Sequence, residues 1–244
     1  MESNKRAYLI LLMLVLTSVI IFCAERKFLV AEPRGATLSN YEKVPGMDKI
    51  FLLMEDFEGF SADSIDLSKE NFFSYGSAKI TVDHSHSDGS PISLKSSLEV
   101  EWTGAENYGG WGKGIGANID LDITTDFLNF RIFIPEGVKT EESIKIILEE
   151  DDNDDGKLQK DKDDAWVYTV NIPVKSGWQM ISAPLKDFKD DNEGGDQKFN
   201  VTRKGGLHTV IFGFLNTEKY VRGQKWYFDF VCFSHGKISE PIRN

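Results

Sequence analysis

The stretch FLNFRIFIP, residues 127–135, decides the fold class of this 244-residue chain. Successive side chains of a β-strand point to opposite faces, so a period of two residues indicates a strand with two distinct faces. One face of this stretch is wholly apolar: Leu128, Phe130, Ile132 and Ile134. The other face is mixed: Phe127, Asn129, Arg131 and Phe133. The pattern predicts a strand that packs one face against a hydrophobic core.

Short apolar runs of the same kind recur along the chain and are separated by Gly, Asp, Asn and Ser. β-branched and aromatic residues dominate them, and few show the 3.6-residue period of a helix. The further candidate strands are residues 49–57, 93–102, 117–123, 143–150, 166–174, 178–185, 209–216 and 225–233. About nine strands with turn signals between them predict an all-β protein, an antiparallel β-sandwich or barrel.

Composition and charge narrow the class of protein. Hydrophobic residues make up 41% of the chain and aromatic residues 12%, which suits a folded domain with a real core. The net charge is −11, and the calculated pI is near 4.9. Phosphate recognition needs a basic surface, so this charge argues against nucleic acid as a partner.

The N-terminal residues have the layout of an export signal. Lys5 and Arg6 precede an apolar run over residues 7–22, and Cys23 follows where a bacterial lipoprotein is cut and acylated. Phe22 is bulkier than the small residue expected before that cysteine. A lipoprotein, an uncleaved signal anchor and plain secretion all remain open, and all three predict an extracytoplasmic domain.

The domain plan follows from these features. A turn-rich stretch before the first candidate strand reads as a tether that lifts the domain off a membrane. With Cys23 acylated, Cys232 has no intramolecular partner and is expected to be a buried strand cysteine. We predict a leader at residues 1–23, a tether at 24–48, a β-sandwich domain at 49–236 and a tail at 237–244.

Residues 149–166, EEDDNDDGKLQKDKDDAW, hold nine acidic residues and three lysines, a net charge of −6. Four positions match the opening of an EF-hand loop: Asp151, Asn153, Asp155 and Gly156. The twelfth position is Lys162 instead of glutamate, and the flanks look like strands, so this is not an EF-hand. Three interpretations stay open: a rim around a ligand, a solvated loop, or a calcium loop whose shell is completed by Asp161, Asp163 or Asp164.

Five motifs occur in a suggestive order along the chain. They are EDFEG (55–59), GGWGKGIGANI (109–119), DAWVYTV (164–170), SGWQMISAPLKDF (176–188) and WYFDFVCF (226–233). Over residues 49–234 this succession resembles the jelly-roll, galactose-binding-like modules that occur as carbohydrate-binding modules beside polysaccharide-degrading enzymes. It is more distantly similar to the domain of complex I intermediate-associated proteins.

The resemblance implies a structural calcium ion held between the first and last strands. The matching positions here are Asp56 or Glu58 in the first motif and Asp229 in the last. A carboxylate between Phe228 and Phe230 is costly to bury without a cation or hydrogen-bond donors. The alternative is an exposed carboxylate at a sheet edge.

Sugars are bound by aromatic rings that stack on their C–H faces and by planar polar side chains that pair with hydroxyls. Tyr108 and Trp111 lie in a glycine-rich segment, and Trp166 and Tyr168 follow the acidic loop; we take these four as candidate ligand contacts. Trp178 and Phe188 are expected in the core. Possible polar partners on the same sheet are Arg131, Lys145, Gln179 and Asn216.

The sequence contains no G-x-S-x-G, H-E-x-x-H or P-loop motif. The leading hypothesis is therefore a non-catalytic, surface-anchored glycan-binding module stabilised by calcium. A second hypothesis is an envelope lipoprotein with a structural or protein-interaction role on the same fold. A third is an extracellular polysaccharide hydrolase or lyase, which requires paired carboxylates in a cleft.

Overall fold

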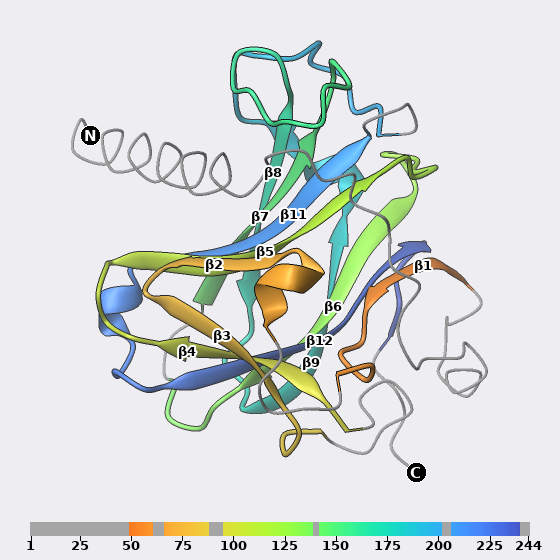
Figure 1. Ribbon diagram of the computed structural model, residues 1–244. Coiled ribbons are helices and arrows are strands. Elements are labelled where there is room, and N and C mark those ends of the chain that lie inside the picture. Colours follow the sequence, from red (N-terminus) through yellow and green to blue (C-terminus); the bar gives the residue numbers. More distant parts are fainter. Residues whose placement is uncertain (1–48, 61–65, 88–94, 139–141, 202–205, 240–244) are drawn as a thin grey trace.

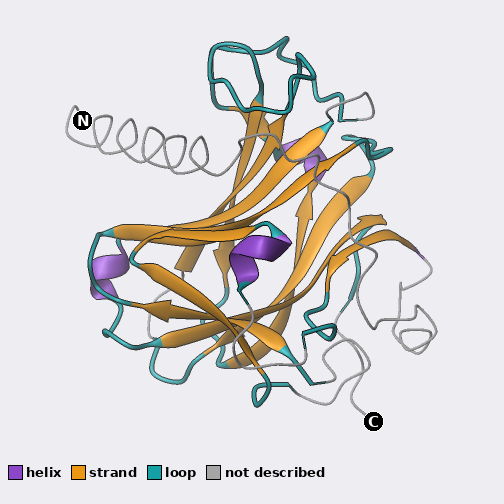
Figure 2. Cartoon of the chain, in the orientation of Figure 1, coloured by secondary structure: helices purple, strands orange, loops and turns teal. Residues whose placement is uncertain are grey.

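The computed structural model describes residues 49–60, 66–87, 95–138, 142–201 and 206–239. The predicted leader with Cys23, the tether, and the end of the tail lie outside these residues. Two antiparallel sheets stack face to face as a β-sandwich (Figures 1 and 2), which confirms the predicted fold class. No helix among the described residues is long and apolar enough to cross a membrane.

Sheet A contains six strands, with β12 (Lys225–His235) at its centre. One side of β12 pairs with β6 (Asp126–Ile134), which in turn pairs with β9 (Gly177–Pro184). The other side of β12 pairs with two strands in succession: β4 (Ser97–Trp102) along residues 225–228 and β1 (Ile50–Glu55) along residues 231–234. β3 (Ala78–Asp83) pairs with β4.

Sheet B also contains six strands, in the order β10-β8-β7-β11-β5-β2. Their bounds are β10 (Lys189–Asp190), β8 (Ala165–Ile172), β7 (Glu142–Glu150), β11 (Leu207–Leu215), β5 (Tyr108–Ala117) and β2 (Phe72–Gly76). The described connections also include short 3₁₀ helices at η3 (Leu67–Glu70), η4 (Leu185–Asp187) and η5 (Thr217–Lys219).

Aromatic side chains fill the space between the sheets. Phe130 of sheet A and Phe212 of sheet B are fully buried, with ring centroids 5.0 Å apart. Trp111 stacks on Phe212 at 4.6 Å, and the edge of its ring meets Phe228 at 5.2 Å. Offset and edge-to-face pairs of this kind each add to the burial of apolar area. The apolar face of residues 127–135 faces this core, as predicted.

A bulge interrupts β12 after Asp229, where the register with β6 shifts. Phe230 has a positive φ of 50°, which is unusual for a residue with a bulky side chain. As a result Phe230 leaves the main core and packs with Leu53, Cys232 and Ile238 in a separate apolar cluster. Cys232 is buried, as predicted.

Two segments differ from their predicted structure. Residues 108–117 form strand β5 although five glycines interrupt the segment, because β5 hydrogen-bonds to both β11 and β2. Residues 118–123, predicted as part of a strand, are not in a sheet. Ile119 and Leu121 still bury their side chains, but the Ile119 amide bonds to the Val201 carbonyl and the Leu121 amide to that of Ile119.

Candidate functional site

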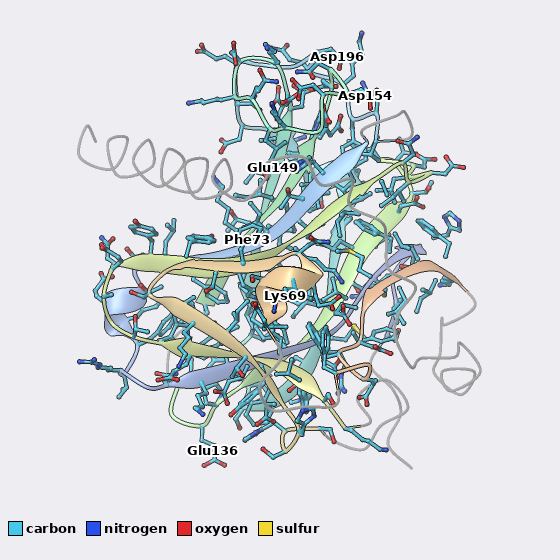
Figure 3. All side chains as sticks on the ribbon, in the orientation of Figure 1. Lys69, Phe73, Glu136, Glu149, Asp154 and Asp196 are labelled. Atoms are coloured by element: carbon cyan, nitrogen blue, oxygen red, sulfur yellow. The ribbon has the colours of Figure 1, made fainter. Side chains whose placement is uncertain are left out.

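The outer face of sheet B, turned away from sheet A, carries a layer of aromatic rings laid over glycines. Phe73 and Tyr75 of β2 alternate with the core residue Phe72 and therefore point outward. A Cβ atom on Gly112 would lie 2.4 Å from Phe73 Cζ, so the Phe73 ring lies against the β5 backbone. Both rings are half-buried (Figure 3 labels Phe73).

Tyr75 reaches further across the sheet. A Cβ atom on either Gly110 of β5 or Gly213 of β11 would lie 2.7 Å from Tyr75 Oη. The ring therefore crosses β5 and ends over β11, which only glycines at those positions allow. Tyr108 borders the same face, half-buried, beside Tyr75. We call Phe73, Tyr75 and Tyr108, with the three glycines beneath them, the aromatic face.

A charged pair borders the aromatic face. Lys145 of β7 pairs in register with Gly213. The Lys145 side chain and the Tyr75 hydroxyl therefore both lie next to the space that a side chain at Gly213 would occupy. Lys145 Nζ lies 2.8 Å from Asp191 Oδ2, with side-chain exposures of 14% and 48%. The face thus combines apolar rings with one cationic donor and one anionic acceptor.

Three of the predicted ligand residues point the other way. Trp111 is 2% exposed and faces the core, because the residues that face outward on β5 are the alternating glycines. Trp166 also faces inward, where its ring meets Phe199 at 5.5 Å, and Tyr168 packs on Phe188 at 5.4 Å. The structure corrects the expectation that these three rings contact a surface ligand.

Arg131 is not at the aromatic face either. It lies on sheet A, is 1% exposed, and stands 5.1 Å from the ring of Trp178, which is itself buried. Gln179 is buried and donates to the carbonyls of Pro173 and Lys175. Asn216 is exposed directly after β11, whose last residue pairs with Tyr108. Of the predicted ligand contacts and polar partners, Tyr108, Lys145 and Asn216 are near the face.

The acidic loop contains a compact group of carboxylates. Ligand oxygens of Glu150, Asp152 and Asp164 all lie within 4.8 Å of one another, and this cluster could hold a metal ion. Glu150 and Asp164 are each 1% exposed. The loop rises at one end of sheet B next to the segment of Asp196 (Figure 3). We call these three residues the acidic cluster.

The oxygens of the acidic cluster are only partly satisfied by the protein. Asp164 Oδ2 accepts a hydrogen bond from the Lys198 amide at 3.2 Å, whereas Asp164 Oδ1 is buried and has no hydrogen-bond partner among the described residues. Gly195, with φ at +67°, approaches so closely that a Cβ there would lie 1.8 Å from this oxygen. Burial, followed by the charges of Asp152 and Asp190, raises the pKa of Asp164 to about 6.

The predicted EF-hand-like ligands instead hold the loop's own backbone. Asp151 accepts hydrogen bonds from the amides of Asp155 and Gly156 at 3.2 and 2.7 Å. Asn153 Oδ1 accepts from the Asp155 amide at 3.0 Å, and Asp155 Oδ1 accepts from that of Lys157 at 3.0 Å. Glu150 and Asp152 of the acidic cluster each precede a predicted ligand by one residue in the sequence. Asp164 is the one member of the cluster that the sequence analysis also named as a candidate ligand.

The calcium site predicted between the first and last strands stays a prediction, and its carboxylates accept hydrogen bonds from nearby backbone amides. Asp56 Oδ1 accepts from the Glu58 amide at 3.2 Å, and Glu58 Oε1 accepts from the amides of Lys95 and Ser96. Asp229 Oδ1 accepts from the next amide in the chain, and Asp229 pairs in register with Arg131. Among the described residues, none of Asp56, Glu58 and Asp229 belongs to a group of three side-chain ligand atoms that lie within 4.8 Å of one another.

A cavity of about 20 Å³ separates the acidic loop from the sheet. It is lined by Glu149, Leu158, Gln159, Lys160, Asp163, Asp164, Ala165 and Asn192. Burial raises the pKa of Glu149 to about 7 and that of Asp163 to about 6, with a further contribution from neighbouring carboxylates. Leu158 packs here on Ile147 and Ile211 of sheet B, which fastens the acidic loop over one end of the outer face.

Comparison with known proteins identifies the fold. No protein-family model and no curated protein sequence matches the chain. The solution structure of the module CtCBM11 is 19% identical, with a TM-score of 0.51, over 78% of this chain and 96% of that one. A family 11 carbohydrate-binding module of the cellulase Lic26A-Cel5E from Clostridium thermocellum is 18% identical, with a TM-score of 0.49. The match covers 78% of this chain and 96% of that module. The chain thus has the β-sandwich jelly-roll fold of family 11 carbohydrate-binding modules.

Proposed function

We propose that the chain binds a glycan on the outer face of sheet B and does not act on it chemically. The observation that carries this proposal is the aromatic face. Tyr75 and Phe73 lie flat against glycines, half-exposed, on the outside of a sheet whose other face forms the core. The absence of side chains at Gly110, Gly112 and Gly213 leaves the space that the Phe73 and Tyr75 rings occupy.

The chemistry of the aromatic face suits a sugar. Aromatic rings offer an apolar surface to the C–H face of a pyranose, and a half-buried tyrosine also contributes a hydroxyl at the edge of that surface. The Lys145–Asp191 pair supplies a charged donor and a charged acceptor at 2.8 Å, and such groups bond hydroxyls more strongly than neutral ones do. The likeness of fold to CtCBM11 supports the same function.

A binding role fits the acidic groups better than hydrolysis does. Glu149 and Asp163 have raised pKa values, as catalytic acids often have. The cavity that they line measures about 20 Å³, however, whereas sites for small molecules usually span about 300–1,000 Å³. We attribute these shifts to burial, with a smaller contribution from neighbouring carboxylates.

We further propose that the cation of the acidic cluster is calcium. Calcium is a hard ion that takes six to eight oxygen ligands from carboxylates and carbonyls, and the cluster offers three carboxylates from the end of β7 and the acidic loop. Calorimetric titration of the full chain with calcium chloride should detect one site, which Asp164→Asn abolishes. Glu193→Gln, an exposed change in the neighbouring loop, should leave it intact.

We also propose that the protein is held at a membrane outside the cytoplasm by an acyl chain on Cys23. The support is the basic pair, the apolar run and the cysteine in that order. Cells grown with radiolabelled palmitate should incorporate label into the wild-type chain and not into Cys23→Ser. Label in neither protein would favour the signal anchor or plain secretion.

Polysaccharide binding tests the main proposal directly. The full chain, kept soluble in mild detergent, is titrated with mixed-linked β-glucan, xylan, mannan, galactan and pectin. Binding of at least one polysaccharide, weakened at least tenfold by Tyr75→Ala and unaffected by Thr169→Ala on the same face, is the expected result. A cooperatively folded chain that binds none of the five would favour the structural envelope lipoprotein.

A further inference from the structure

We infer that a divalent cation in the acidic cluster controls the affinity of the aromatic face for its glycan, by fixing Asp191 and through it Lys145. The inference rests on the function proposed above. It concerns two sites on sheet B that are joined by a short series of hydrogen bonds and one ion pair.

The acidic cluster has the properties of a built site. Asp164 Oδ1 is buried without a hydrogen-bond partner among the described residues, and leaving a buried charged oxygen unpartnered is costly. One carboxylate oxygen from each of Glu150, Asp152 and Asp164 lies within 4.8 Å of the other two. Gly195 brings the backbone of a second loop against the same oxygens. A cation there would satisfy Asp164 and neutralise the mutual repulsion.

The second loop, residues 190–200, is attached to the acidic cluster at two points. The Lys198 amide donates to Asp164 Oδ2 at 3.2 Å, and the Asn200 amide donates to both carboxylate oxygens of Glu150 at 3.1 and 3.3 Å. The position of the second loop therefore depends on the positions of two carboxylates of the cluster. If those carboxylates separate, the loop loses its anchors.

Asn192 and Asp191 connect this loop to the strand that follows Asp164. Asn192 Nδ2 donates to the Asp163 carbonyl at 2.6 Å, and Asn192 Oδ1 accepts from the Ala165 amide at 2.7 Å. The Asp191 amide donates to the Ala165 carbonyl at 2.9 Å. Asp191 is thus fixed by the residue directly after Asp164.

Asp191 in turn positions Lys145 at the aromatic face. Its Oδ2 lies 2.8 Å from Lys145 Nζ, and Lys145 adjoins the Tyr75 hydroxyl over Gly213. An exposed ion pair alone contributes little to stability. Its effect here is to help hold the lysine side chain in one direction, so that less conformational entropy is lost when a sugar hydroxyl binds.

Without a cation, the carboxylates of the acidic cluster repel one another and the two loops open by local unfolding. Asp191 then no longer holds Lys145. Couplings between two sites typically change affinity by about 5- to 150-fold. We expect calcium removal to weaken polysaccharide binding by about tenfold and, since coupling is reciprocal, saturating polysaccharide to tighten calcium binding by the same factor.

The experiment titrates the full chain with each of the five polysaccharides, first with calcium and then with a chelator. The wild type should bind about tenfold more weakly in the chelator. Asp164→Asn should bind at the chelated level under both conditions. Asp191→Asn should bind calcium normally and yet lose the calcium dependence of polysaccharide binding, whereas the matched change Glu193→Gln should keep it.

Equal polysaccharide affinity with and without calcium, in a chain that binds both, would overturn the inference. So would a calcium dependence that survives Asp191→Asn. If calcium does not bind the wild type, the inference fails while the glycan proposal stands. If none of the polysaccharides binds, the glycan proposal itself fails. If Asp164→Asn does not fold, the inference is tested by comparing the calcium dependence of polysaccharide binding in the wild type and in Asp191→Asn.

Discussion

At the scale of single residues, the two sheets are joined by a buried ion pair. Lys113 points inward from β5, and its Nζ lies 2.6 Å from Glu55 Oε2 at the end of β1 and 4.7 Å from the centre of the Phe72 ring. Glu55 Oε1 accepts hydrogen bonds from the amides of Asp56 and Phe57. The lysine therefore balances a carboxylate that shapes the turn after β1.

We predict that Lys113→Met destabilises the fold by about 3–5 kcal/mol, because it leaves the Glu55 carboxylate buried without its cation. The double variant Glu55→Gln/Lys113→Met should regain a large part of the loss, since no charge is then buried. Urea unfolding, monitored by tryptophan fluorescence, measures the free energy of unfolding of both variants. A loss below about 1 kcal/mol in the single variant would contradict the argument.

His208 is 2% exposed on β11, and burial lowers its pKa below the ordinary value of 6.5, against the opposing charges of Asp151 and Asp155. Just below pH 6.5, His208 is therefore protonated in the unfolded chain and stays neutral in the folded chain. The free energy of unfolding should therefore fall as the pH drops below 6.5, by up to about 1.4 kcal/mol per pH unit.

The variant His208→Gln isolates this contribution. It should flatten the pH dependence of stability between pH 6.5 and the lowered pKa, as measured by denaturant unfolding at a series of pH values. His235→Gln, at a histidine whose side chain is 64% exposed, serves as the matched control. An unchanged slope in His208→Gln would show that other groups cause the acid sensitivity.

At the scale of elements, β2, β5 and β11 together make the aromatic face. We predict that Gly213→Ala weakens polysaccharide binding about tenfold, because the added Cβ would lie 2.7 Å from Tyr75 Oη and displace the ring. Removing that oxygen removes the collision. The double variant Gly213→Ala/Tyr75→Phe should therefore bind more tightly than Gly213→Ala alone, as measured by calorimetry. No recovery in the double variant would show that the ring is not what the alanine displaces.

Strands with contrast between their two faces are the ones that the sequence predicts well. β6 alternates apolar with mixed residues, and β11 alternates Val210, Phe212 and Phe214 with smaller or shorter ones, so both were recognised. β5 has glycine at nearly every outward position, which reads as a loop and makes Trp111 seem exposed. The alternation of Phe73 and Tyr75 in FFSYG was a usable signal, too short to be noticed alone.

The acidic loop shows why the sequence pointed to a candidate cation site without identifying the carboxylates that cluster there. The excess of carboxylates is visible along residues 149–166. Which oxygens remain for an ion depends on backbone turns that consume the carboxylates of Asp151 and Asp155. It also depends on residues 195–200, which are distant in sequence and reach the cluster only in the folded sandwich. Neither property can be read from residue spacing.

At the scale of the whole molecule, Cys232 reports on the integrity of sheet A. Its side chain is fully buried on β12, and burial raises the pKa of the thiol, so little reactive thiolate forms in the folded chain. In a Cys23→Ser background, we predict slow labelling by a thiol reagent that accelerates only across the global unfolding transition. Ser143→Cys, at an exposed site, should label at once, and equally fast labelling of Cys232 would contradict the prediction.

β12 is both the last strand among the described residues and the centre of sheet A, where it pairs with β1, β4 and β6. While the ribosome is still making the chain, sheet A therefore exists only as the pairs β3–β4 and β6–β9, with β1 unpaired. Sheet A can be completed only after β12 has been synthesised, because all three of its pairing partners precede it in the chain. A fold whose central strand follows its partners in sequence therefore delays the burial of its core until late in synthesis.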